Sequence, residues 1–286
     1  MGVRIIPRLD IKGPNLVKGV HLEGLRVLGK PEHFARFYYE NGADELFYMD
    51  AVASLYNRNS LNDIIRRTAE EISIPLTVGG GLRSVDDIRN VLRCGADKVA
   101  INTAALARPQ IIREAAERFG SSTILVSIEA IREPNGTYGA YTDCGRNATG
   151  RDAFEWALEA VDLGAGELVV TSVDREGTGK GFDLELTRRI AENVPVPVIA
   201  CGGAGSIEHV RDVVVEGRAD AVCIASCLHY EFLKTYDALA EVYSGEGNTE
   251  FLKKQRGFSK VKEFSLPSLK RFLAGGGIDC RCLQTS

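Results

Sequence analysis

A repeat inside the chain constrains its fold more strongly than any other feature of the sequence. The segment 42–46, Gly-Ala-Asp-Glu-Leu, returns at 164–168 as Gly-Ala-Gly-Glu-Leu, an offset of 122 positions. Further matches at this or nearly this offset pair Pro75 with Pro197, Gly95 with Gly217, Asp97 with Asp220, and 5–10 with 124–129. A pattern that occurs twice indicates two copies of one structural unit. The fold must therefore contain two similar halves.

Short apolar runs alternate with longer amphipathic segments within each half. In the first half we expect strands at 4–11, 45–50, 75–79 and 98–101, and helices at 31–41, 60–71, 84–94 and from Pro109 onward. A polar loop that contains Lys18 is expected after the first strand. Strands that alternate with helices of about ten residues indicate βαβ units and a parallel sheet.

Four strands in each of two halves make eight, and eight parallel βα units most simply close into a (β/α)8 TIM barrel. An open, doubly wound sheet is the alternative, but that fold does not predict a duplicated half. We therefore predict an α/β chain with a single barrel domain over 1–286, built from half-barrels at about 1–120 and 121–230.

The composition excludes several classes of protein. Hydrophobic residues make up 44% of the chain and charged residues 26%, as in an ordinary globular protein, and the net charge of −4 argues against a general nucleic-acid binder. No apolar run approaches the length of a membrane span. The seven cysteines are scattered and odd in number, which predicts free thiols and a cytoplasmic location. We expect no metal site and no cofactor.

Two carboxylates stand where the chemistry of a barrel is expected. Active sites of such barrels lie at the carboxyl ends of the strands, and Asp10 and Glu129 end strands one and five. These strands lie on opposite sides of an eight-stranded mouth. Two facing carboxyl groups can divide acid and base work when their surroundings separate their pKa values. In the alternative interpretation they cap loops or pair with Lys12 or Lys18.

Two glycine-ended strands predict two anion sites. Glycines between a strand and a helix bring backbone N–H groups close to a ligand. Neighbouring strands would join Gly80 and Gly81 to Asn102 and Thr103 in a first cradle. A second cradle would combine strand ends and the loop after strand six, and its members are Thr171, Glu176, Gly177, Gly202, Gly203, Ala225 and Ser226. One cluster alone would be read as a tight turn, but the symmetric pair favours two phosphates.

Charged residues also begin several strands, at the opposite end of the predicted barrel. They are Arg4, Glu45, Lys98 and Glu167. Buried charges persist only when they are paired, and two of each sign around one ring can pair with one another. The ring is either a structural ion-pair plug or a polar gate for a small molecule that enters from below.

Six ordered segments resemble the cyclase subunit of imidazole glycerol phosphate synthase. They are Arg-Ile-Ile-Pro-Arg-Leu-Asp at 4–10, Leu-Val-Lys-Gly at 16–19, Thr-Val-Gly-Gly-Gly at 77–81, Ala-Ile-Asn-Thr-Ala at 100–104, Thr-Ser-Val-Asp-Arg-Glu-Gly-Thr at 171–178 and Ala-Cys-Gly-Gly-Ala-Gly at 200–205. The resemblance covers about residues 1–230 and resumes at 269–281.

The resemblance implies an ammonia-dependent step in histidine biosynthesis. In that step a formimino aminoimidazole carboxamide ribotide with two phosphates becomes imidazole glycerol phosphate and aminoimidazole carboxamide ribotide. A glutaminase partner on the N-terminal face would supply the ammonia through a gate of Arg4, Glu45, Lys98 and Glu167. Carried over by position, Asp10 would be the general base or acid and Lys18 a phosphate contact.

The chain departs from the family pattern at two places. Glu129 stands where the family has Asp as its second catalytic carboxylate, and about thirty residues, 235–264, precede a last helix at about 268–274. Such departures suit a paralogue that uses channelled ammonia to make an acetamidino sugar for surface polysaccharide. A barrel without activity that serves as a docking platform is a second alternative. Retention of Asp10, Lys18 and both cradles argues against the platform.

Overall fold

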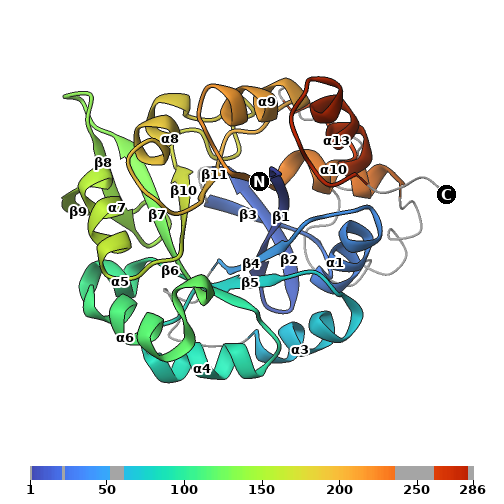
Figure 1. Ribbon diagram of the computed structural model, residues 1–286. Coiled ribbons are helices and arrows are strands. Elements are labelled where there is room, and N and C mark those ends of the chain that lie inside the picture. The colour runs from blue at the N-terminus through green and yellow to red at the C-terminus, as the bar shows by residue number, and fades with distance from the viewer. Residues whose placement is uncertain (1, 21–22, 52–60, 236–260, 283–286) are drawn as a thin grey trace.

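Eight parallel strands close into a barrel, which a ring of helices surrounds (Figure 1). The computed structural model describes residues 2–20, 23–51, 61–235 and 261–282. The barrel strands are β1 (Arg4–Lys12), β4 (Leu46–Asp50), β5 (Leu76–Gly79), β6 (Lys98–Ile101), β7 (Ile124–Arg132), β10 (Glu167–Ser172), β11 (Val198–Cys201) and β12 (Ala221–Ile224). Each pairs in parallel with the next, and the β12–β1 and β7–β10 pairings complete the ring. The predicted barrel is confirmed.

The helices follow the strands with bounds close to those expected. They are α1 (Pro31–Glu40), α3 (Asn62–Glu71), α4 (Val85–Arg93), α5 (Thr103–Ala107), α6 (Gln110–Phe119), α7 (Ala153–Asp162), α8 (Leu184–Ala191), α9 (Ile207–Val215), α10 (Ser226–Thr235) and α13 (Leu266–Gly275), with a short 3-10 turn η1 (Ser121–Thr123). Ser84 caps α4 with its hydroxyl, while Ser206 precedes α9 without a side-chain cap. Pro109 precedes the first residue of α6.

Two β-hairpins at the mouth of the barrel were not predicted. One contains β2 (Asn15–Val20) and β3 (Glu23–Gly29), and the other contains β8 (Tyr138–Thr142) and β9 (Asn147–Asp152), which extends outward from β7 (Figure 1). The expected loop around Lys18 is therefore wrong, because Lys18 lies on β2. That strand pairs antiparallel with the end of β1, which holds Lys18 above the barrel.

An apolar layer fills the barrel between its two ends. Its buried members point inward from every barrel strand except β5 and are Ile6, Phe47, Ala100, Leu125, Val169, Ile199, Cys201, Ala221 and Cys223, with Met49 packed against them. Barrels of this size fill their interior with side chains, so the lumen is a packed core. The layer separates the floor of the barrel from its mouth.

The floor is closed by a repeated hydrogen bond that explains the Gly-Ala-Asp pattern. Each aspartate carboxylate accepts from the backbone N–H near the start of a neighbouring strand: Asp44 from Ile5 at 2.7 Å, Asp97 from Leu76 at 2.8 Å and Asp220 from Val198 at 2.9 Å. In the fourth copy Gly166 replaces the aspartate, because a Cβ there would lie 2.2 Å from the Ser121 carbonyl oxygen.

The last helix is fixed to this floor by a buried lysine. Lys270 of α13 donates from Nζ to the Gly42 carbonyl oxygen and to Asp44 Oδ1, both at 2.7 Å. The helix expected at about 268–274 is present and slightly longer, since α13 spans Leu266–Gly275. Most of the predicted insertion, residues 236–260, lies outside the described residues. The half-barrel boundaries stay a prediction.

Removal of the buried lysine should destabilise the protein far more than removal of an exposed cation with the same partner. The Lys270 side chain is 2% exposed, whereas Arg281, which also pairs with Asp44, is 55% exposed. We expect Lys270→Ala to lower the free energy of unfolding by about 3 kcal/mol, because it leaves a buried carboxylate short of a partner. Arg281→Ala should cost less than about 1 kcal/mol. Urea unfolding of both variants tests this, and equal losses would contradict it.

Candidate active site

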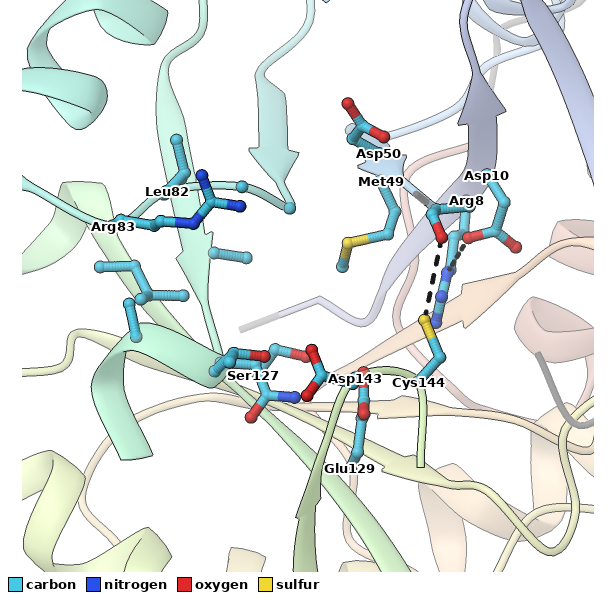
Figure 2. Close-up of a pocket in the computed structure, with 18 of the residues that line it drawn as sticks. Arg8, Asp10, Met49, Asp50, Leu82, Arg83, Ser127, Glu129, Asp143 and Cys144 are labelled. Carbon is cyan, nitrogen blue, oxygen red and sulfur yellow. Dashed lines mark hydrogen bonds and ion pairs between the residues drawn. The ribbon is translucent and has the colours of Figure 1, made fainter. Parts of the chain in front are cut away.

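A cavity of about 350 Å³ opens at the carboxyl ends of the strands (Figure 2). It brings together seven of the residues that the sequence singled out: Asp10, Lys18, Gly80, Gly81, Asn102, Thr103 and Glu129. Asp10 ends the inward-facing part of β1, and Glu129 lies on β7, four strands away in either direction around the ring. The two carboxyl groups therefore face one space from opposite walls, as predicted.

The surroundings of the two carboxyl groups differ. Asp10 Oδ1 accepts from Arg8 Nε at 2.8 Å in a buried ion pair. Glu129 forms no ion pair with the described residues and accepts from the Gly145 backbone N–H at 2.9 Å. Burial raises the pKa of Glu129, and the hydrogen bond from Gly145 opposes that rise only in part. Glu129 is thus the group suited to give a proton, and Asp10, the anionic member of an ion pair, is suited to accept one.

The turn between β8 and β9 fixes the position of Glu129. Asp143 and Cys144 line the cavity and adopt left-handed backbone conformations, with φ of 55° and 62°. Such conformations are strained for residues other than glycine and cluster at functional sites. They bring the Gly145 N–H to the Glu129 carboxylate.

Several lining residues were missed by the sequence reasoning. They are Arg8, Met49, Ser127, Asp143 and Cys144, which Figure 2 shows around the two carboxyl groups. The candidates predicted from the sequence are residues at the very ends of the strands. Residues i and i+2 of a strand share a face, and that rule relates Arg8 to Asp10 and Ser127 to Glu129. Asp143 and Cys144 lie on the unpredicted hairpin.

The first glycine cradle has a backbone that only glycine can form. Gly80 has a φ of 95°, and a Cβ at this position would lie 2.6 Å from the Asp50 carbonyl oxygen. The close approach leaves room for a ligand against the backbone. The Asn102 side-chain oxygen beside it is buried and has no hydrogen-bond partner among the described residues. A donor on a bound ligand would satisfy it.

The second cradle is built in the same way but is nearly filled. Gly202 has a φ of 88°, and its Cβ would lie 2.7 Å from the Ser172 carbonyl oxygen. Only about 20 Å³ remains in the cavity here, which is lined by Arg8, Glu176, Gly177, Cys201, Gly202, Gly203, Ala204, Cys223, Ala225 and Ser226. Thr171 is buried on β10 and lines neither cavity.

A buried ion pair stands beside the second cradle. Lys18 Nζ lies 2.7 Å from Glu176 Oε1, and both side chains are almost completely buried. A phosphate in this cradle would compete with Glu176 for the lysine. In the alternative interpretation of the sequence, Asp10 was expected to cap a loop or to pair with Lys12 or Lys18. In the structure its ion-pair partner is Arg8.

The four predicted floor residues form a closed ring of ion pairs. Arg4 lies 3.0 Å from both Glu45 and Glu167. Lys98 lies 3.0 Å from Glu45 and 2.8 Å from Glu167. Burial would lower the pKa of Arg4, but Glu167 and Glu45 raise it. The predicted pairing of two charges of each sign is confirmed. The apolar layer separates this ring from the carboxyl groups at the mouth.

The fold and the site together define a class of protein. A barrel mouth that holds two facing carboxyl groups between two glycine turns is suited to acid–base chemistry on a small ligand with anionic ends. All seven cysteines are free. No helix in the described part of the chain is long and apolar enough to cross a membrane.

Comparisons with known proteins identify the family. The family described as "Histidine biosynthesis protein" matches residues 4–234, which contain all eight barrel strands. The chain is 59% identical over 206 residues to the imidazole glycerol phosphate synthase subunit HisF of Legionella pneumophila, a match that covers 72% of this chain and 97% of that protein. It is 50% identical over 232 residues to the subunit of the same name from Thermosynechococcus vestitus, covering 79% and 83%.

The chain therefore belongs to the histidine biosynthesis family, and its similarity is to the HisF subunits of imidazole glycerol phosphate synthase. The resemblance read from the sequence is confirmed. Nothing in the comparisons favours the sugar-amidating paralogue or the docking platform.

The raised pKa of Glu129 predicts a pH dependence of stability. Because the folded state holds the Glu129 proton more tightly than the unfolded state, the free energy of unfolding should fall as pH rises from about the ordinary value of 4.5 through the raised pKa. Glu129→Gln keeps an acceptor for Gly145 but cannot ionise, so its stability should lack this fall. Urea unfolding of both proteins between about pH 4 and pH 8 measures the difference. Parallel curves would show that Glu129 titrates normally.

Proposed function

We propose that the cavity carries out the cyclase reaction of imidazole glycerol phosphate synthase. Ammonia and a bis-phosphorylated formimino aminoimidazole carboxamide ribotide give imidazole glycerol phosphate and aminoimidazole carboxamide ribotide. The observation that supports this most strongly is the placement of Asp10 and Glu129 in one cavity, between two glycine turns. Imidazole ring closure needs protons removed from the incoming nitrogen and a proton given to a leaving group.

Each carboxyl group has a distinct role in this reaction. Asp10 takes protons from the nitrogen, because its carboxyl group lines the cavity and is held in place by the Arg8 guanidinium. Glu129 supplies the proton to the departing group, because burial raises its pKa. The Gly145 N–H keeps the Glu129 carboxyl group directed into the cavity from β7.

The two glycine turns bind the two phosphates of the ribotide. Gly80, Gly81, Asn102 and Thr103 receive one phosphate at the open first cradle. The second phosphate is bound by the backbone of Gly202 and Gly203 with Ala225 and Ser226, and Lys18 exchanges Glu176 for the phosphate as it binds. A phosphate offers Lys18 more charge than a carboxylate, which supports this exchange.

A glutaminase subunit supplies the ammonia. It docks on the N-terminal face of the barrel, where Arg4, Glu45, Lys98 and Glu167 form the ring. The ring acts as a gate, since opening one ion pair leaves each charge with a second partner. Ammonia then crosses the apolar layer to the carboxyl groups at the mouth.

Turnover of the ribotide tests the proposal directly. The purified chain is given ammonium chloride at alkaline pH with the formimino ribotide, and the release of aminoimidazole carboxamide ribotide is followed. We expect turnover by the wild type and at least a 100-fold loss in Asp10→Asn. Absence of turnover in the wild type and in Glu129→Asp would refute the histidine-pathway reaction. Amidation of an acetamido sugar under the same conditions with a glutaminase present would then identify the paralogue.

The gate predicts a difference between the two sources of ammonia. In Lys98→Met the ring loses one cation, so Glu45 and Glu167 share Arg4 alone and the passage is disturbed. We expect glutamine-dependent turnover with the partner to fall by about tenfold or more, and turnover with added ammonium to change by less than about threefold. The exposed Arg36, on the outside of the barrel in α1, gives the control variant Arg36→Met. Equal losses with both ammonia sources would contradict a gate.

A further inference from the structure

Arg8 lies between the two cavities, on the same strand as Asp10. It lies two residues before Asp10 on β1, so both side chains point into the barrel. The residue is only 5% exposed, and it lines both the large cavity and the small one. Arg8 is therefore the boundary between the two glycine cradles.

Two hydrogen bonds fix the guanidinium group. Nε donates to Asp10 Oδ1 at 2.8 Å from the same strand, and Nη1 donates to Cys201 Sγ at 3.2 Å on β11 (Figure 2 shows the first). Nη2 takes part in neither of these two bonds. The plane of the group is thus set by two strands, and the residue also lines both cavities.

The charges around Arg8 come from several elements. Asp10 and Cys201 contact it, Glu176 and Cys223 act on it from the β10 loop and β12, and Lys18 lies beyond Glu176. Burial would lower the pKa of Arg8, but Asp10 first, then Cys201 and Glu176, raise it well above its ordinary value. The Arg8 guanidinium group therefore stays positively charged at neutral pH.

Stability alone does not explain a guanidinium at this depth. Burying an ion pair costs desolvation, and replacing such a pair with apolar side chains is often neutral or stabilising. The neighbouring interior position Ile6 on the same strand is filled by an apolar side chain. A cation here therefore points to a role in the site.

We propose that Arg8 is a positioning and specificity-determining residue. It holds the Asp10 carboxylate toward the cavity and, from its position between the two cavities, donates to an oxygen at the middle of a ligand whose two ends occupy the glycine cradles. This assignment rests on the proposed function for the identity of that ligand. The arginine guanidinium group is planar and carries a fork of N–H donors, which the lysine ammonium group lacks. Lysine is therefore not equivalent to arginine at this position.

Steady-state kinetics with the formimino ribotide and ammonium chloride test the proposal. Arg8→Met should lower kcat by about 100-fold and raise KM by about tenfold, since both the base and the ligand lose a charged hydrogen bond. Arg8→Lys should recover kcat to within about tenfold while KM stays raised, because the charge near Asp10 returns but the fork does not. Arg36→Met, at an exposed side chain on α1, is the control and should change neither kcat nor KM.

The pH profile separates positioning from mere packing. In Arg8→Met the acidic limb of the kcat profile should move to higher pH, and Arg8→Lys should return it. Thermal unfolding of each variant checks that the barrel is intact. Wild-type kcat, KM and pH profile in a folded Arg8→Met would overturn the proposal. So would equal losses in Arg8→Met and Arg8→Lys with no movement of the acidic limb.

A substrate-free measurement keeps this assignment distinct from the proposed function. If the wild type leaves the ribotide unchanged, the proposed function fails, and nitrogen-15 NMR of the arginine side chains then decides about Arg8. We expect a slowly exchanging Nε–H resonance that is lost in Arg8→Lys and moves in Asp10→Asn. An Arg8 resonance that exchanges as fast as those of surface arginines would overturn the assignment whatever the reaction.

Discussion

Closure of the strand ring is the constraint on which the rest of the structure depends. With β12 paired to β1 and β7 paired to β10, no barrel edge is left open, and the lumen is filled by apolar side chains. Charged groups can then enter the interior only at its two ends. The ion-pair ring and the carboxyl groups are separated because they lie at opposite ends of the barrel strands, as Arg4 and Asp10 do on β1.

Duplication accounts for the backbone of the site but not for its chemistry. Gly80 lies against the Asp50 carbonyl oxygen, and Gly202 lies against the Ser172 carbonyl oxygen. The two glycines are 122 positions apart in the sequence, and so are Asp50 and Ser172. Yet one turn borders about 350 Å³ of space and the other about 20 Å³. The difference comes from side chains that the repeat does not share, since Glu176 and Arg8 fill the second turn. A symmetric scaffold thus carries an asymmetric site.

The sequence predicted what periodicity and backbone conformation control. The barrel strands, the glycine turns and the paired floor charges follow from apolar runs, from glycine and from charge balance, and all are present. Lys18 was misplaced because β2 is short and contains a glycine, so that it is recognised only by its pairing with β1. The bond of Arg8 to Cys201 could not be predicted, because the two residues lie 193 positions apart in the sequence. Side-chain partners across the barrel leave no local signal.

Glu129 shows how such a distant partner can compensate for a change in side-chain length. The resemblance implies an aspartate at this position. Glutamate extends the carboxyl group by one methylene, and displacement of about 1 Å can cost about 100-fold in rate. Here the end of the longer side chain is held by the Gly145 N–H, from a turn whose Asp143 and Cys144 keep a costly left-handed backbone. The carboxyl group is therefore fixed at its far end by the hairpin as well as at its Cα by β7. The reach of the acid is set by these two elements together, so the longer residue does not by itself imply a misplaced proton donor.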